Sequence, residues 1–171
     1  MTDLIPAWVN GTLTQVEKLE VHQRGLRHMA VSVFVMRGRE VLLQRRALGK
    51  YHTPGLWANT CCTHPAWGED PILCAARRLH EELGIAGLAL HRVGGIEYRA
   101  EVGDDRVGHE GDGCFAAQAP ANLTLRLDPT EVMDTRWITL DALEVEVEAT
   151  PQRFTPWLRI YLAEGLGEAV V

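Results

Sequence analysis

The sequence lacks the features that would place it in a membrane or outside the cell. No apolar run approaches the roughly 20 residues of a membrane-spanning helix. Residues 1–4 contain none of the basic residues with which a secretory signal peptide begins. The four cysteines form neither a CxxC pair nor a zinc-ribbon pattern, and the adjacent Cys61 and Cys62 are poorly placed to bond to each other. We therefore expect a cytoplasmic protein with reduced thiols and no membrane insertion.

An excess of positive charge is also missing. The chain has 17 Lys and Arg against 23 Asp and Glu, which gives a net charge of -6 at pH 7. A protein of this net charge has no general electrostatic attraction to nucleic acids or to anionic membrane surfaces, so we expect neither as a partner. Internal repeats, low-complexity tracts and linkers are absent as well. The 171 residues, of which 46% are apolar, therefore predict one domain over residues 1–171 that buries its own core.

The chain is organised around residues 57–65, Trp-Ala-Asn-Thr-Cys-Cys-Thr-His-Pro. Side chains alternate between the two faces of an extended segment, so Cys62 and His64 should share one face. Cys61 and Thr63 should point the other way. The stretch therefore presents a thiol beside a potential metal ligand.

A helix should follow this stretch. Asp70 is a typical N-cap, Pro71 suits the first helical position and Gly84 lies just past the expected end. Arg78 and Glu82, one turn apart, should share a face. The apolar stripe of this helix should consist of Ile72, Ala75, Ala76, Leu79 and Leu83.

The remaining pattern predicts mixed strands and two further helices. The expected strands cover residues 30–36, 41–44, 88–93, 96–101 and 136–138, with residues 1–15 forming a turn or an edge strand and 114–118 an apolar run. Gly94-Gly95 should interrupt the chain between the third and fourth of these strands, and residues 103–106 should form a turn. Residues 107–113 are too rich in glycine to indicate a strand interior. The further helices should cover residues 140–147, capped by Thr139, and 156–163. Together, these strands and helices predict an α+β fold of the α/β/α sandwich type.

Two sets of polar residues are candidates for binding. His22 and His28 flank the entry to a buried strand, although a single histidine is more often a surface or capping residue. Arg45, Arg46 and Lys50 form a cationic cluster, which by itself is usually a solvated face. Directly upstream of the cysteine and histidine stretch, however, the cluster could hold a phosphorylated substrate through the forked donors of arginine.

Residues 63–85 resemble the Nudix box, whose usual form is Gly-x5-Glu-x7-Arg-Glu-apolar-x-Glu-Glu-x-Gly-apolar. The corresponding positions are Thr63, Glu69, Arg77, Arg78, Leu79, Glu81, Glu82, Gly84 and Ile85. Thr63 replaces the glycine, and Arg78 replaces the glutamate next to the arginine. Nudix hydrolases need that cluster of carboxylates to hold divalent metals around a diphosphate, so Arg78 should weaken hydrolysis badly.

Residues 16–157 as a whole resemble type 1 isopentenyl-diphosphate isomerase, a branch of the Nudix superfamily. The shared motifs are Glu17-Lys18 with His22, Leu26-Arg27-His28, Arg45-Arg46-Ala47, Lys50, Pro54-Gly55-Leu56-Trp57-x-Asn59, Cys62-x-His64-Pro65, Tyr98-Arg99-Ala100, Asp128-Pro129-x-Glu131-Val132 and Phe154-Thr155-Pro156-Trp157. Their order and spacing together make the match specific. The resemblance implies the Nudix fold, with a mixed central sheet flanked by helices.

The resemblance also implies a role for individual residues. It implies catalysis by Cys62 and Glu110, helped by Tyr98 and Trp157, and a diphosphate site made of Lys18, Arg46, Lys50 and Arg78. It implies a metal site of His22, His28, His64 and Glu110, which would hold Mn²⁺, Mg²⁺ or Zn²⁺. By the same resemblance, Glu82 would bind a Mg²⁺ ion that arrives with a prenyl diphosphate substrate.

The chemistry of the implied reaction fits these residue types. Moving a double bond from the 3,4 to the 2,3 position requires a proton to be added at carbon 4 and another to be removed from carbon 2, so two acid-base groups must flank the substrate. The face of the Trp157 indole could stabilise the tertiary carbocation between the two transfers. Trp157 could instead be a core aromatic, and Cys62 a buried inert thiol.

One departure from the family bears on the metal site. Where the family has Glu-x-Glu, this chain has Gly108-His109-Glu110, so the first carboxylate is missing. Asp104, Asp105 or Asp112 could replace it, or the site could hold one ligand fewer.

Three functions are therefore open from the sequence. The first is an isomerase that interconverts isopentenyl and dimethylallyl diphosphate and supplies isoprenoid or carotenoid synthesis. The second is a Nudix diphosphate hydrolase, against which Arg78 argues. The third is a weakly active paralogue that binds prenyl diphosphates. This hypothesis is suggested by Gly108, which stands where the family has a glutamate.

Overall fold

The computed structural model of the protein describes residues 3–102 and 106–171, except for the side chain of Asp112. The strands in this part are β1 (Leu4–Val9), β2 (Thr12–Glu17), β3 (Arg27–Arg37), β4 (Glu40–Arg46), β5 (Trp57–Ala58), β6 (Cys61–Thr63), β7 (His91–Glu101), β8 (Val107–Gln118) and β9 (Val132–Thr139). The helices are α1 (Lys18–Arg24), α2 (Pro71–Leu83), α3 (Leu140–Ala149), α4 (Pro156–Ala163), α5 (Leu166–Ala169) and the short 3-10 helix η1 (Pro151–Arg153). No helix among these residues combines the length and apolar character needed to span a bilayer.

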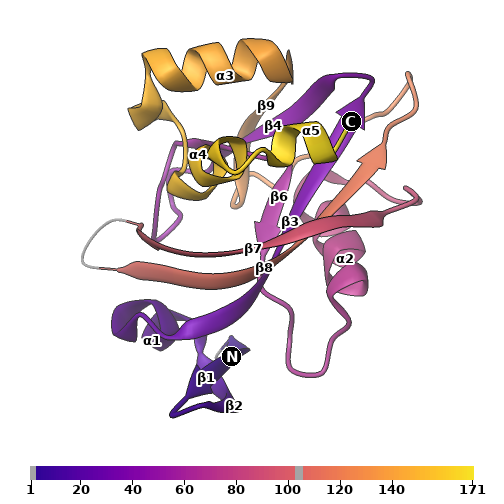
Figure 1. Ribbon diagram of the computed structural model, residues 1–171. Helices are drawn as coiled ribbons and strands as arrows, with labels where there is room; N and C mark the ends of the chain where they lie inside the picture. The colour runs from indigo at the N-terminus through magenta and orange to yellow at the C-terminus, as the bar shows by residue number, and fades with distance from the viewer. Residues whose placement is uncertain (1–2, 103–105) are drawn as a thin grey trace.

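Strand β3 is the centre of a mixed sheet (Figure 1). It pairs with β8 in parallel over ten residue pairs and with β1, β4 and β6 in antiparallel fashion. Strand β7 continues the sheet beyond β8, and β9 continues it beyond β4. The parallel register places His28 opposite Glu110, and the β6 register places Ser32 opposite Cys62.

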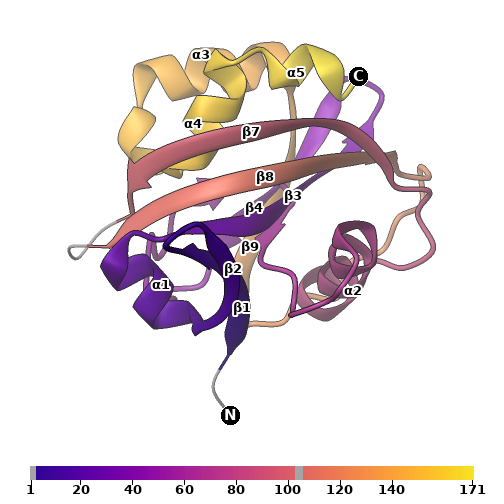
Figure 2. The same cartoon turned by 60° about the horizontal axis from the view of Figure 1, so that its bottom comes forward.

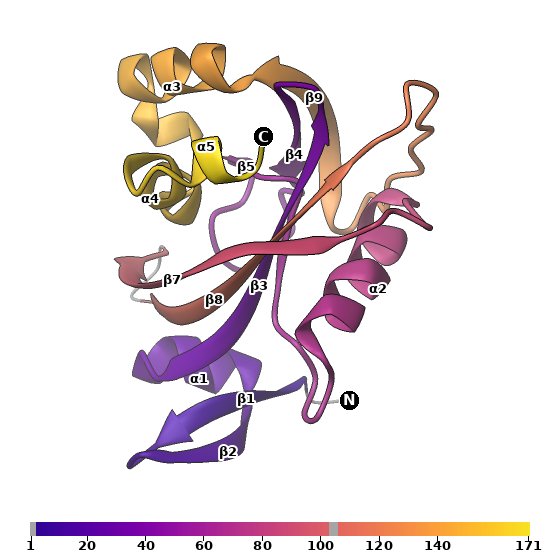
Figure 3. The same cartoon turned by 45° about the vertical axis from the view of Figure 1, so that its right-hand side comes forward.

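Helices cover both faces of the sheet. Helices α3, α4 and α5 lie on one side and α2 lies on the other, as Figure 3 shows. Successive residues of β3 therefore enter different cores: Phe34 and Met36 pack with the α3 and α4 side, whereas Val33 and Val35 pack with α2. The hairpin of β1 and β2, together with α1, lies at one end of the molecule (Figure 2). This arrangement confirms the α+β sandwich with a mixed central sheet.

The ends of helix α2 are those that the sequence predicts. The side chain of Asp70 accepts a hydrogen bond from the Ile72 amide, and Pro71 occupies the first turn. Gly84 ends the helix with φ of 69°, and a Cβ atom there would lie 2.8 Å from the Cβ of Arg126, so only glycine fits. The predicted stripe is wrong at one position: Ala76 is exposed, and Cys74 is buried in its place.

The predictions for β7 and β8 are wrong in three places. Residues 88–90 lie outside any strand, and β7 runs through Gly94-Gly95, where the register shifts by a bulge instead of breaking. Strand β8 includes the glycine-rich residues 107–113. It pairs with β3 on one side and β7 on the other, and this double pairing outweighs the low strand propensity of glycine.

Helices α1 and α5 and the short helix η1 were missed from the sequence, which predicts only three helices. Helix α1 has a Glu17 N-cap and a Gly25 C-cap but spans only seven residues, too few for a clear apolar period. Helix α5 is shorter still. Residues 1–15, expected as a turn or an edge strand, contribute β1 and most of β2. The turn expected at residues 103–106, with Asp104 and Asp105, falls almost wholly outside the described residues.

Candidate active site

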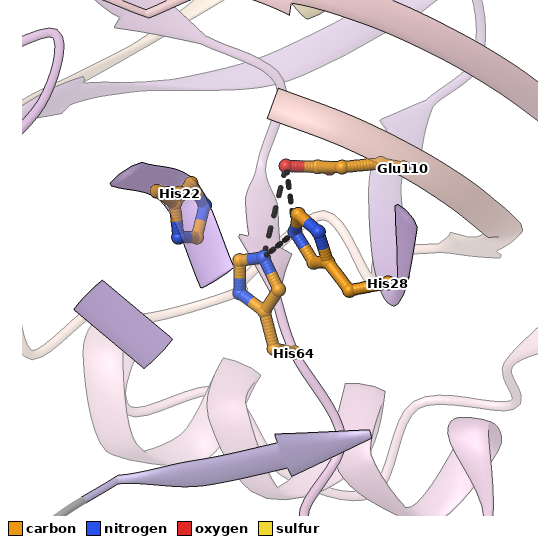
Figure 4. Close-up of side chains that lie close together, drawn as sticks. All are labelled: His22, His28, His64 and Glu110. Atoms are coloured by element: carbon orange, nitrogen blue, oxygen red, sulfur yellow. Dashed lines mark hydrogen bonds and ion pairs between the residues drawn. The ribbon is translucent and has the colours of Figure 1, made fainter. Parts of the chain in front are cut away.

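Three histidines and one glutamate converge at the end of the sheet near α1 (Figure 4). His22 comes from α1, His28 from β3, Glu110 from the neighbouring position on β8 and His64 from the residue after β6. One potential ligand atom from each lies within 4.8 Å of the others. The Nε2 atoms of His28 and His64 are 2.9 Å apart, and Glu110 Oε1 lies 3.5 and 3.7 Å from them.

Two backbone carbonyls set the tautomers of this cluster. His22 Nδ1 lies 2.7 Å from the Lys18 carbonyl oxygen, and His28 Nδ1 lies 2.9 Å from that of Leu26. Since a carbonyl can only accept, each Nδ1 carries the hydrogen and each Nε2 presents a lone pair to the cluster. The Nε2 atom of His22 is buried and has no hydrogen-bond partner among the described residues. A divalent cation would satisfy it, so these four residues fit a metal.

Electrostatics give the cluster the protonation states that metal ligands need. Burial, reinforced by nearby His28, lowers the pKa of His22 to about 4. Burial likewise places the pKa of His64 well below its usual value. For Glu110, burial alone would raise the pKa, but the close contacts of its Oε1 with the Nε2 atoms of His28 and His64 outweigh burial and hold the pKa well below the ordinary range. Two neutral imidazoles and a carboxylate are therefore available at neutral pH.

A pocket adjoins the cluster. Its walls come from helices on both faces of the sheet and from the loop before β5. The lining residues are Lys18, Arg46, Lys50, Tyr51, His52, Cys62, Thr63, His64, Arg78, Glu82, Glu110 and Trp157. Every catalytic, diphosphate-binding or metal-binding residue that the family resemblance implies therefore lines this pocket, except His22, His28 and Tyr98. His22 and His28 lie beside the pocket in the cluster with His64 and Glu110, and Tyr98 contacts Glu110. Arg45 of the predicted cationic cluster does not line it, and its Nε donates to the Gly55 carbonyl instead.

The two adjacent cysteines have different surroundings, as the alternation predicts. The Cys62 thiol lines the pocket and lies 2.9 Å from Asn59 Oδ1, which accepts its hydrogen bond. Cys61 is fully buried on the α2 side and lies 3.6 Å from Glu82. Thr63, at the end of β6, also borders the pocket.

The four predicted diphosphate ligands gather around the pocket, with different partners. Lys50 pairs with Glu131, and Arg78 lies 2.6 Å from Glu82 and 3.4 Å from Glu131. Among the described residues, Arg46 has no ion pair.

The guanidinium of Arg46 is held by neutral groups instead. Its Nη2 atom donates to the Nδ1 and carbonyl oxygen of His52, both at 3.2 Å. Burial, together with the charge of Lys50, lowers the pKa of Lys18. Lys18 and Arg46, which have no ion pair among the described residues, therefore leave positive charge in the pocket that a bound anion would offset.

Two aromatic residues complete the site. The Tyr98 hydroxyl donates to Glu110 Oε2 at 2.9 Å, which leaves Oε1 directed at the histidines. Trp157, in the first turn of α4, is 3% exposed and lines the pocket, with the Arg46 guanidinium 5.3 Å from its ring centroid. Its indole face therefore already lies beside a cation.

Several residues of the site were missed by the reasoning from sequence. Tyr51 and His52 line the pocket directly after Lys50, and that adjacency was a usable signal. Asn59 holds the Cys62 thiol, and Glu131 links two cations. Both belong to motifs that were noted without a role.

Gly108 lies on the same face of β8 as Glu110. A Cβ atom at Gly108 would be 3.4 Å from Glu110 Oε1, so a longer side chain there would point at the metal-ligand cluster. Of the residues that could replace the missing carboxylate, Asp104 and Asp105 lie outside the described residues, as does the side chain of Asp112.

Comparison with known proteins gives a consistent result. Residues 26–158 match the NUDIX domain model. The chain is 63% identical over 164 residues to a protein named isopentenyl-diphosphate Delta-isomerase from Cereibacter sphaeroides, covering 96% of this chain and 93% of that one. It is 60% identical to the protein of the same name from Rhodobacter capsulatus, covering 95% and 92%.

Solved structures are similar to this chain in fold. A protein from Deinococcus radiodurans superposes with a TM-score of 0.73 at 15% identity, covering 98% of each chain. The MutT NUDIX hydrolase of Burkholderia pseudomallei gives a TM-score of 0.63 at 22% identity, covering 80% of this chain and 96% of that one. At such identities the likeness concerns the fold alone.

Proposed function

The chain belongs to the isopentenyl-diphosphate Delta-isomerase family of NUDIX-domain proteins, and from this premise we propose how its pocket interconverts isopentenyl and dimethylallyl diphosphate. The single observation that carries the proposal is that Cys62 and Glu110 line one pocket together with four cationic side chains. Two acid-base groups and an anion site are what a proton-shifting isomerase of a diphosphate needs. The allylic product would then prime isoprenoid synthesis.

The diphosphate is bound by the cationic part of the pocket. Arg46 is already fixed by His52 and has no ion pair with a carboxylate among the described residues, so its remaining N–H groups can donate directly to a phosphate oxygen. Lys50 and Arg78 share Glu131, whose carboxylate keeps both cations in place before substrate arrives. Glu82 would meet a single Mg²⁺ ion carried by the diphosphate once one of its oxygens leaves Arg78 or Gln44.

The five-carbon tail lies between the two acid-base groups. One of Cys62 and Glu110 adds a proton at the terminal methylene carbon, and the other removes a proton from the carbon two positions away. Tyr98 holds Glu110 by a hydrogen bond to Oε2 throughout. The indole of Trp157 stabilises the positive charge that develops between the two transfers, by roughly 2 kcal/mol in a desolvated site.

His22, His28, His64 and Glu110 would hold a divalent metal. Three imidazoles with one carboxylate favour Zn²⁺ or Mn²⁺ over Mg²⁺, which prefers oxygen ligands. When bound, such an ion supplies positive charge that tunes the proton affinity of Glu110.

Diphosphate hydrolysis is the second candidate, and the surroundings of the Nudix box argue against it. Both oxygens of Glu82 are engaged, one by Arg78 and the other by Gln44 at 2.9 Å. Glu69 and Glu81 are each tied to Arg77 in ion pairs. Few carboxylate oxygens therefore remain to gather several metal ions around a diphosphate.

Incubation of the purified protein with isopentenyl diphosphate and Mg²⁺ tests the proposal. Proton and phosphorus NMR should show dimethylallyl diphosphate accumulating without inorganic phosphate or diphosphate. Release of phosphate would favour the hydrolase. Tight binding of the substrate with neither product would identify a binding protein without turnover.

A further inference from the structure

Two buried hydroxyl groups stand behind the Cys62 thiol, away from the residues that line the pocket. Ser32 Oγ lies 3.3 Å from Cys62 Sγ and 2.6 Å from the hydroxyl of Tyr161. Ser32 and Tyr161 are each 1% exposed. With Asn59 Oδ1 on the other side of the sulfur, the four side chains form one hydrogen-bonded chain.

The fold builds this chain from three separate elements. Ser32 is directly opposite Cys62 in the pairing of β3 with β6, so the two side chains share a face of the sheet. Ser32 is also the single polar residue in the run of residues 30–36. Tyr161 follows Trp157 by one turn of α4, so one helix supplies both a pocket wall and the hydroxyl at the end of the chain.

We propose that Ser32 and Tyr161 are positioning residues, which hold the sulfur of Cys62 toward the pocket during turnover. The inference rests on the proposed function, in which Cys62 exchanges a proton with the substrate. Neither hydroxyl lines the pocket, and both act through the thiol.

The hydrogen-bond directions show why a second partner is needed. Asn59 Nδ2 donates to the carbonyl oxygens of Val33 and Cys61, at 3.0 and 3.2 Å, so its Oδ1 faces the sulfur and can only accept. That oxygen holds the thiol but repels a thiolate. When Cys62 is a thiolate, the Ser32 hydroxyl can donate to its sulfur while the Tyr161 hydroxyl donates to Ser32. The sulfur therefore keeps a partner in both of its protonation states.

The alternative is that Ser32 merely satisfies the hydroxyl of Tyr161 in an apolar core. Both accounts predict that removing a hydroxyl affects stability, since a buried polar group without a partner is costly. Only the positioning role predicts a specific loss in kcat and a change at the Cys62 sulfur.

The test compares Tyr161→Phe, Ser32→Ala and the double variant with the wild type. Tyr161→Phe should lower kcat roughly tenfold, because the free energy of one hydrogen bond corresponds to a rate factor of about that size, and should leave KM within about twofold. The double variant should lose little more than Ser32→Ala alone, because Tyr161 acts only through Ser32. The infrared S–H stretch of Cys62, identified by its absence in Cys62→Ala, should shift in each variant that retains the thiol.

The control is Phe34→Leu, which alters the packing of a ring 5.9 Å from that of Tyr161 and keeps both hydroxyls. It should retain kcat and the S–H frequency. An unchanged kcat and S–H stretch in Tyr161→Phe would overturn the inference, as would an equal loss of kcat in Phe34→Leu or additive losses in the double variant. A wild type that does not isomerise would refute the proposed function, whereas the S–H shift would still report whether the chain of hydroxyls holds the sulfur.

Discussion

The same substitution at two adjacent positions should have opposite consequences. Cys62 lines the pocket and Cys61 is fully buried against α2, so Cys62→Ala should remove an acid-base group while Cys61→Ala removes core volume. Loss of a positioned proton-transfer group typically lowers the rate by about 10²- to 10⁴-fold. We expect Cys62→Ala to lose at least about 10²-fold in kcat and to stay folded, although the buried Asn59 Oδ1 loses its donor at a cost of at least roughly 1 kcal/mol.

The cost of Cys61→Ala follows from its burial. Removing one buried sulfur costs the transfer free energy of that atom plus a small cavity, together roughly 1–2 kcal/mol. A typical domain has about 5–15 kcal/mol of stability, so the variant should stay folded and keep most of its activity. The weak contact with Glu82, at 3.6 Å, adds little.

Two assays separate these outcomes. Initial rates of isomerisation by NMR measure the activity, and urea denaturation measures the free energy of unfolding. Equal losses of activity in both variants would refute the assignment of the two faces of β6. A stability loss confined to Cys62→Ala would refute it as well.

Three further predictions concern charge around the site. Arg78→Glu should raise KM for isopentenyl diphosphate at least about tenfold, because it removes a cation and adds a fourth carboxylate beside three glutamates. Gly108→Glu should raise both the metal content and the turnover, because it places a carboxylate next to Glu110 Oε1, and Gly108→Gln is the uncharged control. Glu69→Gln should destabilise the protein by roughly 1 kcal/mol at pH 7, because hydrogen bonds from Arg77 lower the pKa of Glu69 to about 2. The extra free energy of unfolding of the wild type should be fully present above about pH 4.5 and should be lost as the pH falls through about 2. Urea denaturation of both proteins at several pH values would measure this difference.

Each of these predictions has a contrary result. An unchanged KM in Arg78→Glu would make Arg78 a structural partner of Glu82. Elemental analysis that finds one full metal in the wild type and no change in Gly108→Glu would mean that another acidic residue supplies the ligand. A stability difference for Glu69→Gln that does not depend on pH would exclude the ion pair with Arg77 as its cause.

The sequence predicted which residues lie together around the pocket better than it predicted the helices and strands that carry them. Periodicity and capping located α2, because Asp70, Pro71 and Gly84 act through local hydrogen bonds and backbone angles. Helix α1 was missed, although it carries Lys18 and His22, because seven residues give no clear period. The strand through residues 107–113 was missed because pairing with two distant strands decides it.

The neighbours of the site depend on contacts between distant segments. The face shared by Cys62 and His64 follows from a period of two along one strand, and sequence suffices for it. The approach of Ser32 and Tyr161 to the same thiol joins residues 30 and 99 positions away from Cys62, which no local pattern encodes. Glu131 likewise links Lys50 to Arg78 across the pocket.

The most direct test of the central claim is to follow the reaction in heavy water. If Cys62 and Glu110 exchange protons with the substrate, the wild type should form dimethylallyl diphosphate in which the new methyl group carries deuterium from the solvent. Cys62→Ala and Glu110→Gln should each form almost none, while both still bind the diphosphate. Product without deuterium in that methyl group, or turnover that persists in both variants, would contradict the account.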